Sequence, residues 1–514
     1  MTKPAASASA GAALFRSVQN PMNKRPNLLI FMTDHQRGDT IRRDSACITP
    51  NIDAFRARAV TFTGAYCPAP HCCPSRATFF TGLYPSQHGV WNNVGVSNTL
   101  SRGLFDGVRT FSEDLKEAGY RLYFSGKWHV SQVESPADRG FELLYHNTAQ
   151  YRAFPHVPEY SEWDFYNRQP IDSGGEPRTE GRIIRPGYTA YTQYGIHENP
   201  FGDTNVAMAA ADKLLAMEGD SPFVLYAGPL GPHDPYLVPQ RFLDLYPPGS
   251  LPLPANFDDA MEDKPALYRR TKSRYSQLTR EEHQESVRRY YAFCSYEDYL
   301  FGLVMDALEK SGHGQDTLVL YCSDHGDYVG AHGLWAKGLP CFREAYDICY
   351  MAGGAGIKDP GREEDAPVSL ADWAPTFLEL AGADPGRAFA GRSLVPFLRH
   401  EPVKDWREDC FTQTNGNEVY GIQRAVWNRR WKYVFNAYDF DELYDLVNDP
   451  LEMNNLIYRA DPEHGPWADV VRDMCQKMWR FAHLTHDNCV NPYIMTALAP
   501  FGPGILQEEL EGKF

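Results

Sequence analysis

Two pairs of adjacent acidic and imidazole side chains are the first residues in this sequence whose types suggest chemistry. Asp34 and His35 come soon after one apolar run, and Asp324 and His325 come soon after another. A single Asp or His after a strand is ordinarily a helix cap or a satisfied loop group, but two matched pairs can share one cation. Carboxylates suit hard ions such as Ca²⁺ or Mg²⁺, whereas imidazole suits Mn²⁺, Fe²⁺ or Zn²⁺. The two pairs predict a metal site.

A cysteine in the segment Ala69–Gly82 (APHCCPSRATFFTG) is the candidate nucleophile. Pro74 suits the first turn of a short helix and Gly82 suits its end. Cys72 is then expected in the loop just before the helix, where free backbone N–H groups and the helix dipole favour an anion. Arg76 adds a permanent positive charge in the first turn. This environment fits a cysteine nucleophile of low pKa, and a buried thiol without function is the alternative.

The elements that must position these residues can be read from the apolar runs. Four runs predict buried, mainly parallel strands, and segments with helical spacing lie between them. The strands are expected at Asn27–Met32, Arg121–Phe124, Phe223–Ala227 and Thr317–Cys322, and the helices at Pro50–Arg58, Ser112–Gly119, Asn205–Met217 and Glu281–Lys310. Ligands of open α/β sheets bind beyond the carboxyl ends of the strands. The sequence therefore predicts an α/β fold with a large mixed, mainly parallel sheet flanked by helices.

A smaller second unit is expected after this large domain. We place the large domain at residues 22–400, a loose N-terminal arm at 1–21, and a C-terminal subdomain and tail at 401–514. Strand-like runs at Cys410–Gln413, Ile422–Trp427 and Trp431–Phe435 predict a small antiparallel sheet, which a helix near Trp467–Ala482 follows. The Tyr- and Pro-rich stretch Gln150–Pro200 has little periodicity, so it is predicted to be an elaborated loop over the site.

Charge and cysteine content narrow the classes of partner. The 514 residues carry 50 Lys and Arg against 66 Asp and Glu, a net charge of −16. That field speaks against nucleic acid or an anionic membrane as a partner, so an anionic substrate must be attracted by a local cluster of cations or a metal. Eleven cysteines, an odd and sparse set, favour a reduced protein, and no apolar run reaches the ~20 residues of a membrane helix. We expect a cytoplasmic protein.

The spacing Cys72-x-Pro74-x-Arg76 resembles the signature of the type I sulfatases, in which the cysteine is converted to formylglycine. Further matches to that family follow in its order along nearly the whole chain: TPNID at 49–53, GKWH at 126–129, PHDP at 232–235, SDHG at 323–326, GAHG at 330–333, Lys337, ADWAPT at 371–376 and ELYDL at 442–446. Each match alone is weak, but the ordered set is very specific. The resemblance implies the alkaline-phosphatase-like form of the α/β fold with a smaller C-terminal α+β subdomain.

The resemblance also implies roles for single residues. One divalent metal ion (Ca²⁺, Mn²⁺ or Zn²⁺) would be bound by Asp34, His35, Asp324, His325 and the modified Cys72. One hydroxyl of the hydrated aldehyde would attack sulfur or phosphorus, and deprotonation of the other would release the product. The remaining roles are the general acid His233, the base or positioning group His129, the charge-balancing Arg76, Lys127 and Lys337, and a hydrogen-bond donor, Asn93. A formylglycine-generating enzyme is the partner implied for maturation.

The residue at position 35 is compatible with two different activities. Most sulfatases have a second aspartate where this chain has His35. The related phosphonate monoester hydrolases resemble this chain, because they lack that aspartate too. With two imidazoles the site is softer, so Ca²⁺ is less secure than Mn²⁺ or Zn²⁺. We expect a promiscuous, arylsulfatase-like hydrolase of a small anionic sulfuric ester, with a phosphonate monoester hydrolase or phosphodiesterase as the alternative. A metal-binding protein without catalysis is disfavoured, because the nucleophile, the cations and all the candidate ligands are present.

The C-terminal tail, residues 485–514, is apolar and rich in Pro and Gly at its start. Its large apolar residues are too few to form a core of their own, and an exposed apolar patch usually marks an interface. They are Tyr493, Ile494, Met495, Leu498, Phe501, Ile505 and Leu506. The tail can pack on its own subunit or between subunits. The use of such tails by related phosphonate hydrolases favours a homo-oligomer, most simply a two-fold dimer.

Overall fold

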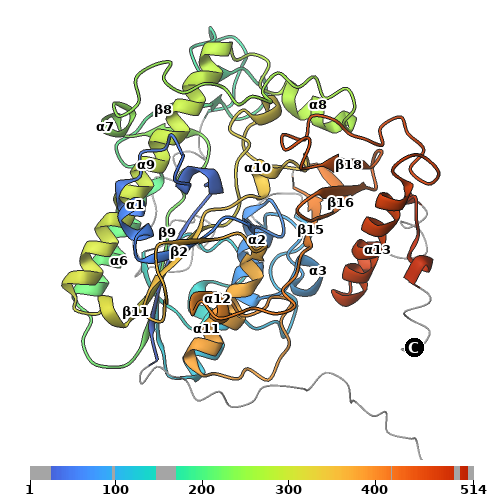
Figure 1. The fold of residues 1–514 in the computed structure, drawn as a ribbon. Helices are drawn as coiled ribbons and strands as arrows, with labels where there is room; N and C mark the ends of the chain where they lie inside the picture. The colour runs from blue at the N-terminus through green and yellow to red at the C-terminus, as the bar shows by residue number, and fades with distance from the viewer. Residues whose placement is uncertain (1–24, 95–98, 146–169, 418, 491–497, 507–514) are drawn as a thin grey trace, which may run out of the picture.

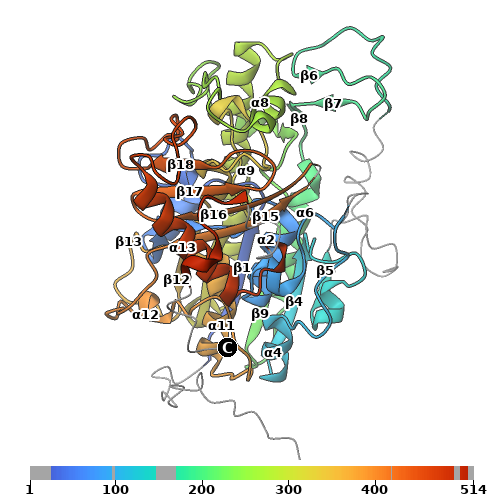
Figure 2. The same ribbon diagram turned by 90° about the vertical axis from the view of Figure 1, so that its right-hand side faces the viewer.

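A mixed eight-stranded sheet lies at the centre of the molecule, with helices on both of its faces (Figures 1 and 2). The computed structural model describes residues 25–94, 99–145, 170–417, 419–490 and 498–506. The strand order is β13-β2-β12-β11-β1-β9-β4-β5. The predicted arm at residues 1–21 lies outside the described residues.

The four predicted strands are consecutive neighbours within this sheet. They are β1 (Asn27–Thr33), β4 (Arg121–Gly126), β9 (Phe223–Gly228) and β11 (Thr317–Ser323), and they pair in parallel in the order β11-β1-β9-β4. In β1, Leu28 and Ile30 join the hydrophobic core on one face of the sheet, whereas Leu29 and Phe31 join the core on the other. Because both faces are covered, the strands are continuous apolar runs, which is why the sequence revealed them.

The outer strands make the sheet mixed. β12 (Tyr350–Gly354) is antiparallel to β11 and to β2 (Ala59–Phe62), whereas β13 (Arg362–Glu364) is parallel to β2 and β5 (Glu142–Tyr145) is parallel to β4. The predicted mixed, mainly parallel sheet is confirmed.

The helices divide between the two faces of this sheet. One face carries α2 (Cys72–Thr81), α4 (Phe111–Glu117), α11 (Trp373–Ala381) and α12 (Val395–Leu398). The other carries α1 (Pro50–Arg56), α6 (Asp203–Leu215), α7 (Gln240–Leu243) and α9 (Arg280–Lys310). All four helices predicted from spacing are present. The long helix α9 starts at a capping box, in which the Thr279 hydroxyl accepts from Glu282 N and Glu282 Oε2 accepts from Thr279 N.

Short elements complete the large unit. They are β3 (Ala65–Tyr66), α3 (Pro85–His88), β6 (Arg182–Ile183), β7 (Tyr191–Thr192), β8 (Tyr194–Ile196), β10 (Tyr236–Val238), α8 (Ala266–Ser273), α10 (Arg343–Tyr346) and β14 (Val368–Ser369). β8 pairs in parallel with β10. The stretch expected to be one loop, residues 150–200, therefore contains short strands in its described part. Among the described helices, none combines the length and apolar character needed to cross a membrane.

A second sheet forms the C-terminal unit, drawn in orange and red in Figure 1. It contains β15 (Cys410–Gly416), β16 (Tyr420–Trp427), β17 (Trp431–Asn436) and β18 (Glu442–Asp445), all antiparallel in that order. The helix α13 (Ala468–Leu484) packs on it through a buried apolar stripe, Val471, Met474, Met478 and Trp479. The predicted antiparallel sheet and following helix are confirmed, with β18 as a fourth strand.

The described part of the tail packs on this same unit. Trp479 Nε1 donates to Phe501 O at 2.7 Å, and Leu506 is buried in the same cluster. Leu498 is exposed, and the expected apolar residues Tyr493–Met495 lie outside the described residues. The described part of the tail thus buries apolar side chains without a second subunit. The dimer stays a prediction.

The helix α2 is anchored by an aromatic cluster on its inner side. Phe80 is fully buried, and its ring centroid lies 4.7 Å from that of Trp128 and 5.6 Å from that of Tyr226 on β9. Phe79 and Phe111 pack against it at 5.3 and 5.4 Å. The contacts fix α2 against the central strands.

We predict that Phe80→Ala lowers the free energy of unfolding by about 3–5 kcal/mol, because it leaves a cavity inside a closed aromatic cluster. Denaturant unfolding measures the change. Phe105→Ala is the control, since Phe105 is about half exposed and its truncation should have little effect. Equal losses in both variants would contradict this account of the packing.

Candidate active site

The paired ends of β1 and β11 bring two carboxylates together. Thr33 and Ser323 are partners in the parallel register, and Asp34 and Asp324 follow them. Asp324 N donates to Thr33 O at 3.2 Å, which ties the two strand ends. Both carboxylates are completely buried. The sheet register therefore places two acidic groups side by side, out of contact with water.

Cys72 faces these carboxylates from the first turn of α2. It is the first residue of the helix, so the expectation that it would sit in the loop before the helix is wrong by one residue: the extended His71 (φ −141°, ψ 144°) is the N-cap. Cys72 Sγ lies 3.5 Å from Asp34 Oδ1 and 3.3 Å from His325 Nε2. The helix ends, as predicted, at Gly82 in a left-handed conformation.

The neighbouring thiols Cys72 and Cys73 have opposite electrostatic environments. Burial opposes ionisation of Cys72, but Lys127, Lys337 and His325 together hold its pKa well below the ordinary value. Burial and the nearby Cys72 raise the pKa of Cys73 well above it. Cys73 Sγ instead accepts a hydrogen bond from Val94 N at 3.3 Å. Only position 72 combines the signature spacing with an environment that stabilises negative charge.

Arg76 and Lys127 balance the two carboxylates. Arg76 Nε donates to Asp324 Oδ2 at 2.8 Å, and its Nη2 donates to Asp34 Oδ2 at 3.2 Å. Its Nη1 donates to the hydroxyl of Tyr226 at 2.8 Å. The Lys127 ammonium contacts Asp34 as well. Burial opposes the charge of Lys127, but Asp34 and Cys72, with a smaller effect of Asp324, together raise the pKa of the lysine.

Two histidines direct ring nitrogens at the same cluster. His325 Nε2 lies 3.7 Å from both Asp34 Oδ1 and Asp324 Oδ1. Burial opposes the charge of its ring, but Asp324 and Cys72 together raise the pKa of His325. His35 Nε2 lies 3.6 Å from Asp34 Oδ1 and contacts the Lys337 ammonium. Burial, followed by His233 and Lys337, holds the pKa of His35 well below its usual value, so its imidazole is neutral.

The donor set fits a divalent cation. Ligand atoms of Asp34, Cys72, Asp324 and His325 all lie within 4.8 Å of one another, and Asp34 and Cys72 form a second such group with His35 and His233. Two buried carboxylates, imidazoles and a sulfur or oxygen donor make a mixed set that suits Mn²⁺ or Zn²⁺ as well as harder ions. The five residues predicted as metal ligands are thus divided between two overlapping groups, which share Asp34 and Cys72.

The other predicted residues also lie around Cys72. Asn93 Oδ1 accepts from Cys73 N at 3.1 Å and so caps the first turn of α2. Burial and then Lys127 lower the pKa of His129 to about 4, against the opposing effect of its hydrogen bond with Cys72. His233 is partly exposed, and its Nε2 lies 3.3 Å from Lys337 Nζ.

Sequence reasoning missed three buried residues at this site. Asp327 lies 2.9 Å from His35 Nδ1, and its position two residues after His325 was the only available signal. Asp203 accepts from Leu230 N and Gly231 N, both at 2.8 Å, and so holds the loop before His233. His71 is buried with both ring nitrogens unpartnered. Burial lowers its pKa to about 3.

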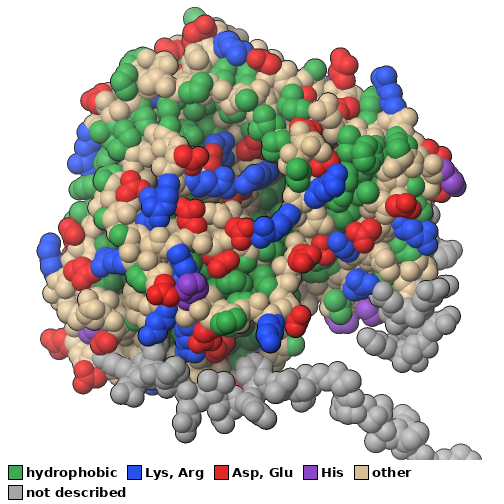
Figure 3. All heavy atoms as spheres, viewed as in Figure 1, with side chains coloured by type: hydrophobic (Ala, Val, Ile, Leu, Met, Phe, Trp, Pro, Cys, Tyr) green, Lys and Arg blue, Asp and Glu red, His purple; other side chains and the backbone are tan. Residues whose placement is uncertain are grey.

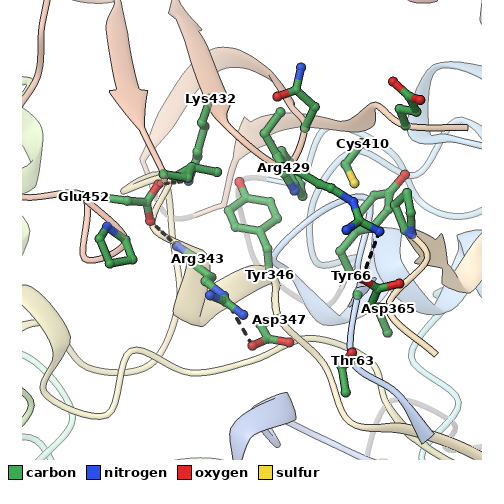
Figure 4. A pocket seen from close by; sticks show the side chains of 18 residues that line it. Thr63, Tyr66, Arg343, Tyr346, Asp347, Asp365, Cys410, Arg429, Lys432 and Glu452 are labelled. Atoms are coloured by element: carbon green, nitrogen blue, oxygen red, sulfur yellow. Dashed lines mark hydrogen bonds and ion pairs between the residues drawn. The ribbon is translucent and has the colours of Figure 1, made fainter. Parts of the chain in front are cut away.

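The surface contributes less to this chemistry than the interior. On the face shown in Figure 3, Lys and Arg side chains are interspersed with Asp and Glu. A cavity of about 290 Å³ lies between the large unit and the C-terminal sheet (Figure 4). Its three lysine and arginine side chains each pair with a carboxylate of the lining: Lys432 with Glu452 at 2.6 Å, Arg429 with Asp365 at 2.9 Å and Arg343 with Asp347 at 3.6 Å. None of the lining residues belongs to the metal cluster. The charge that could hold an anion is the buried cluster around Cys72.

Comparison with known proteins agrees with this geometry. The sulfatase family model matches residues 26–383, and the model described as "N-sulphoglucosamine sulphohydrolase, C-terminal" matches residues 330–483. A choline-sulfatase of Rhizobium meliloti is 30% identical over 88% of this chain and 87% of its own. The chain belongs to the sulfatase family, whose members hydrolyse sulfate esters and typically use a metal ion and formylglycine.

Solved structures establish the same fold. The phosphonate monoester hydrolase of Agrobacterium radiobacter superposes with a TM-score of 0.71 at 23% identity, covering 90% of this chain and 96% of that one. A 2-O GAG sulfatase superposes with a TM-score of 0.70, also at 23% identity, over 91% and 94% of the two chains. The alkaline-phosphatase-like fold predicted from the sequence is confirmed.

We predict that Arg76→Met lowers the free energy of unfolding of the metal-free protein by about 3–5 kcal/mol, because it strips a buried partner from Asp34 and Asp324. Chemical denaturation in the presence of a chelator gives the value. Arg58→Met serves as the control, since Arg58 and Glu309 form a pair in which both side chains are nearly half exposed. That pair should contribute less than about 1 kcal/mol. A small loss for Arg76→Met would show that the two carboxylates do not depend on it.

Proposed function

We propose that the protein hydrolyses sulfate monoesters of small organic alcohols or phenols, using formylglycine made from Cys72 beside one divalent metal ion. The observation that carries this proposal is the position of Cys72, within 3.5 Å of Asp34 and 3.3 Å of His325. Against the effect of burial, the charges of Lys127 and Lys337 hold the pKa of its thiol well below the ordinary value. A residue so placed can attack an anion that the surrounding cations hold.

The metal would be held by Asp34, His35, Asp324 and His325, together with residue 72. When bound, the ion and the formylglycine supply a nucleophilic oxygen at neutral pH. The protein's own residues then have to bind the sulfate group, balance its charge and move protons.

Charge balance falls to Arg76, Lys127 and Lys337. Arg76 is occupied by Asp34 and Asp324, so its role is to hold those carboxylates in place. Lys127 contacts Asp34, and Lys337 contacts His35. Their ammonium groups are suited to the sulfate oxygens, where charge stabilisation in a dry site is strongest.

Proton transfer falls to two histidines. His233 is 18% exposed at the mouth of the site, on a loop that Asp203 holds, and so is placed to protonate the departing alcohol. His129 has its pKa lowered to about 4, so at neutral pH it is uncharged and can accept a proton. Its hydrogen bond to Cys72 places it beside the nucleophile.

A phosphonate monoester or phosphate diester is the second candidate substrate. His35 replaces the second aspartate usual in sulfatases, and the fold matches a phosphonate monoester hydrolase as well as it matches a sulfatase. The similarity to a choline-sulfatase favours sulfate, and suggests an alkyl rather than an aryl leaving group. Broad specificity is expected, because sulfate and phosphate-diester transition states overlap in charge and geometry.

The substrate class is tested by comparing kcat/KM for matched aryl sulfate, aryl phosphonate and aryl phosphate diester substrates, with the sulfate ester of choline as the alkyl case. We expect the highest value with a sulfate. A phosphonate or diester preferred over every sulfate would replace our proposal with the second candidate.

We predict that Cys72, and not Cys73, is converted to formylglycine when the chain is produced with a formylglycine-generating enzyme. Mass spectrometry of the peptide that contains both residues identifies the modified one. Cys72→Ala should abolish turnover, whereas Cys73→Ala should change it only a few-fold, because its thiol only accepts a bond from Val94 N. Full activity with an unmodified thiol at position 72 would end this proposal.

We predict that His233→Asn slows hydrolysis of alkyl sulfates by roughly 10²–10⁴-fold, and that of aryl sulfates with good leaving groups far less. A general acid matters most when the leaving alkoxide is a strong base. Steady-state kinetics on a series of leaving groups gives the comparison. Equal losses across the series would mean that His233 binds the sulfate rather than protonating the alcohol.

A further inference from the structure

We propose that Asp327 is a positioning residue that fixes His35 as a metal ligand through Nε2. This inference rests on the proposed function only in that the cluster binds a divalent metal. It accounts for the orientation of the His35 ring toward the cluster.

The backbone of His35 is held in an unusual conformation. Its φ is +67°, in the left-handed region that side-chain-bearing residues seldom adopt. His35 O accepts from the Tyr290 hydroxyl at 2.8 Å, and His35 N points to Asp324 Oδ1 at 3.4 Å. The side chain is completely buried. Fixed from both sides, the residue directs its ring into the cluster.

The two ring nitrogens of His35 have different surroundings. Nδ1 lies 2.9 Å from Asp327 Oδ2, whereas Nε2 contacts the Lys337 ammonium and faces Asp34 Oδ1 at 3.6 Å. A neutral imidazole has one N–H donor and one nitrogen with a free lone pair. The partner of Nδ1 therefore decides whether Nε2 can bind a metal.

The two oxygens of Asp327 are placed to accept hydrogen bonds. The Tyr236 hydroxyl donates to Oδ2 at 3.0 Å and Val329 N donates to Oδ1 at 2.9 Å, so each oxygen already meets a donor. The carboxylate is fully buried. When Asp327 is ionised, His35 Nδ1 is its proton donor, and the lone pair of Nε2 is left facing Asp34 and the Lys337 ammonium.

His325 shows the same arrangement with a different acceptor. Its Nδ1 lies 2.7 Å from Gly326 O, a carbonyl that can only accept. Its Nε2 faces Asp34 and Asp324. Histidines that bind metals generally donate their other N–H to a carboxylate or a backbone carbonyl. The two histidines of this site use one acceptor of each kind.

Asp234 is the other carboxylate near His35, and it is the weaker partner. Its Oδ1 is 3.9 Å from His35 Nδ1, beyond hydrogen-bond distance, and the side chain is 19% exposed. The Tyr191 hydroxyl lies 3.4 Å from its Oδ2. Asp234 therefore provides a matched control, since it lies on the same side of the ring without the same contact.

The test is the strength with which the purified enzyme retains Mn²⁺ against a chelator in Asp327→Asn. An asparagine that accepts from Val329 N must present its amide to His35 Nδ1, and that forces the proton onto Nε2. We expect Mn²⁺ to be held 10- to 100-fold more weakly, the usual loss when such a partner is removed. ¹⁵N NMR of the histidine side chains should show the His35 proton moving from Nδ1 to Nε2.

Three controls separate this role from a general structural one. Asp234→Asn should leave Mn²⁺ retention unchanged. His35→Gln should weaken it about as much as Asp327→Asn, and the double variant should be no weaker than either single variant. Asp327→Ser replaces Asp327→Asn if the amide variant does not fold, and the same loss is expected.

Several outcomes would overturn the proposal. One is an unchanged Mn²⁺ affinity in Asp327→Asn, and another is an additive loss in the double variant. A third is two Mn²⁺ ions per chain, one of them lost with Asp327, which would make Asp327 a ligand itself.

Discussion

Two buried carboxylates at the joined ends of β1 and β11 are the constraint on which the rest of the site depends. Asp34 and Asp324 lie side by side without water, and neither can stay ionised there alone. Arg76 and Lys127 supply the opposite charge, and the nucleophile helix is the element that delivers Arg76. Burying the pair thus requires α2 to dock with its first turn against the sheet. The position of Cys72 follows from this docking.

The same requirement explains the interior around α2. A helix that carries a fully buried arginine at its start has to be held firmly, because a shift would separate charges inside the protein. The rings around Phe80 hold its inner side, and Asn93 caps its first turn. The C-terminal sheet contributes as well, since Asn417 Oδ1 accepts from Asn93 N at 2.9 Å. The second sheet is therefore part of the support of the site, although it carries none of the candidate ligands.

Much of this arrangement could be predicted from the sequence, for identifiable reasons. Strands buried on both faces are continuous apolar runs, so β1, β4, β9 and β11 were recognisable, and their carboxyl ends carry the reactive residues. Cys72 was identified as the candidate nucleophile from local spacing. Its exact place was missed by one residue, because nothing in the sequence shows that His71 is extended and Cys72 already helical.

Contacts between distant segments were beyond sequence reasoning. Asp327 contacts His35 from 292 residues further along the chain, and Asp203, at the start of α6, contacts the loop before His233. Such pairs leave no periodic or spacing signal in a single sequence. The short strands β6 to β8 were missed for a related reason, since strands of two or three residues are too short to show alternation.

The burial of Cys72 also has a consequence for the order of events during synthesis. Its side chain is 1% exposed once β11 and α2 have met, so the folded molecule offers no access to a modifying enzyme. β11 leaves the ribosome roughly 250 residues after Cys72, at about 5–20 residues per second. The proposed conversion of Cys72 to formylglycine would thus compete with folding for a period of tens of seconds. A chain that closed its central sheet before this modification would be trapped with a thiol, so the yield of formylglycine would depend on the ratio of two rates rather than on affinity.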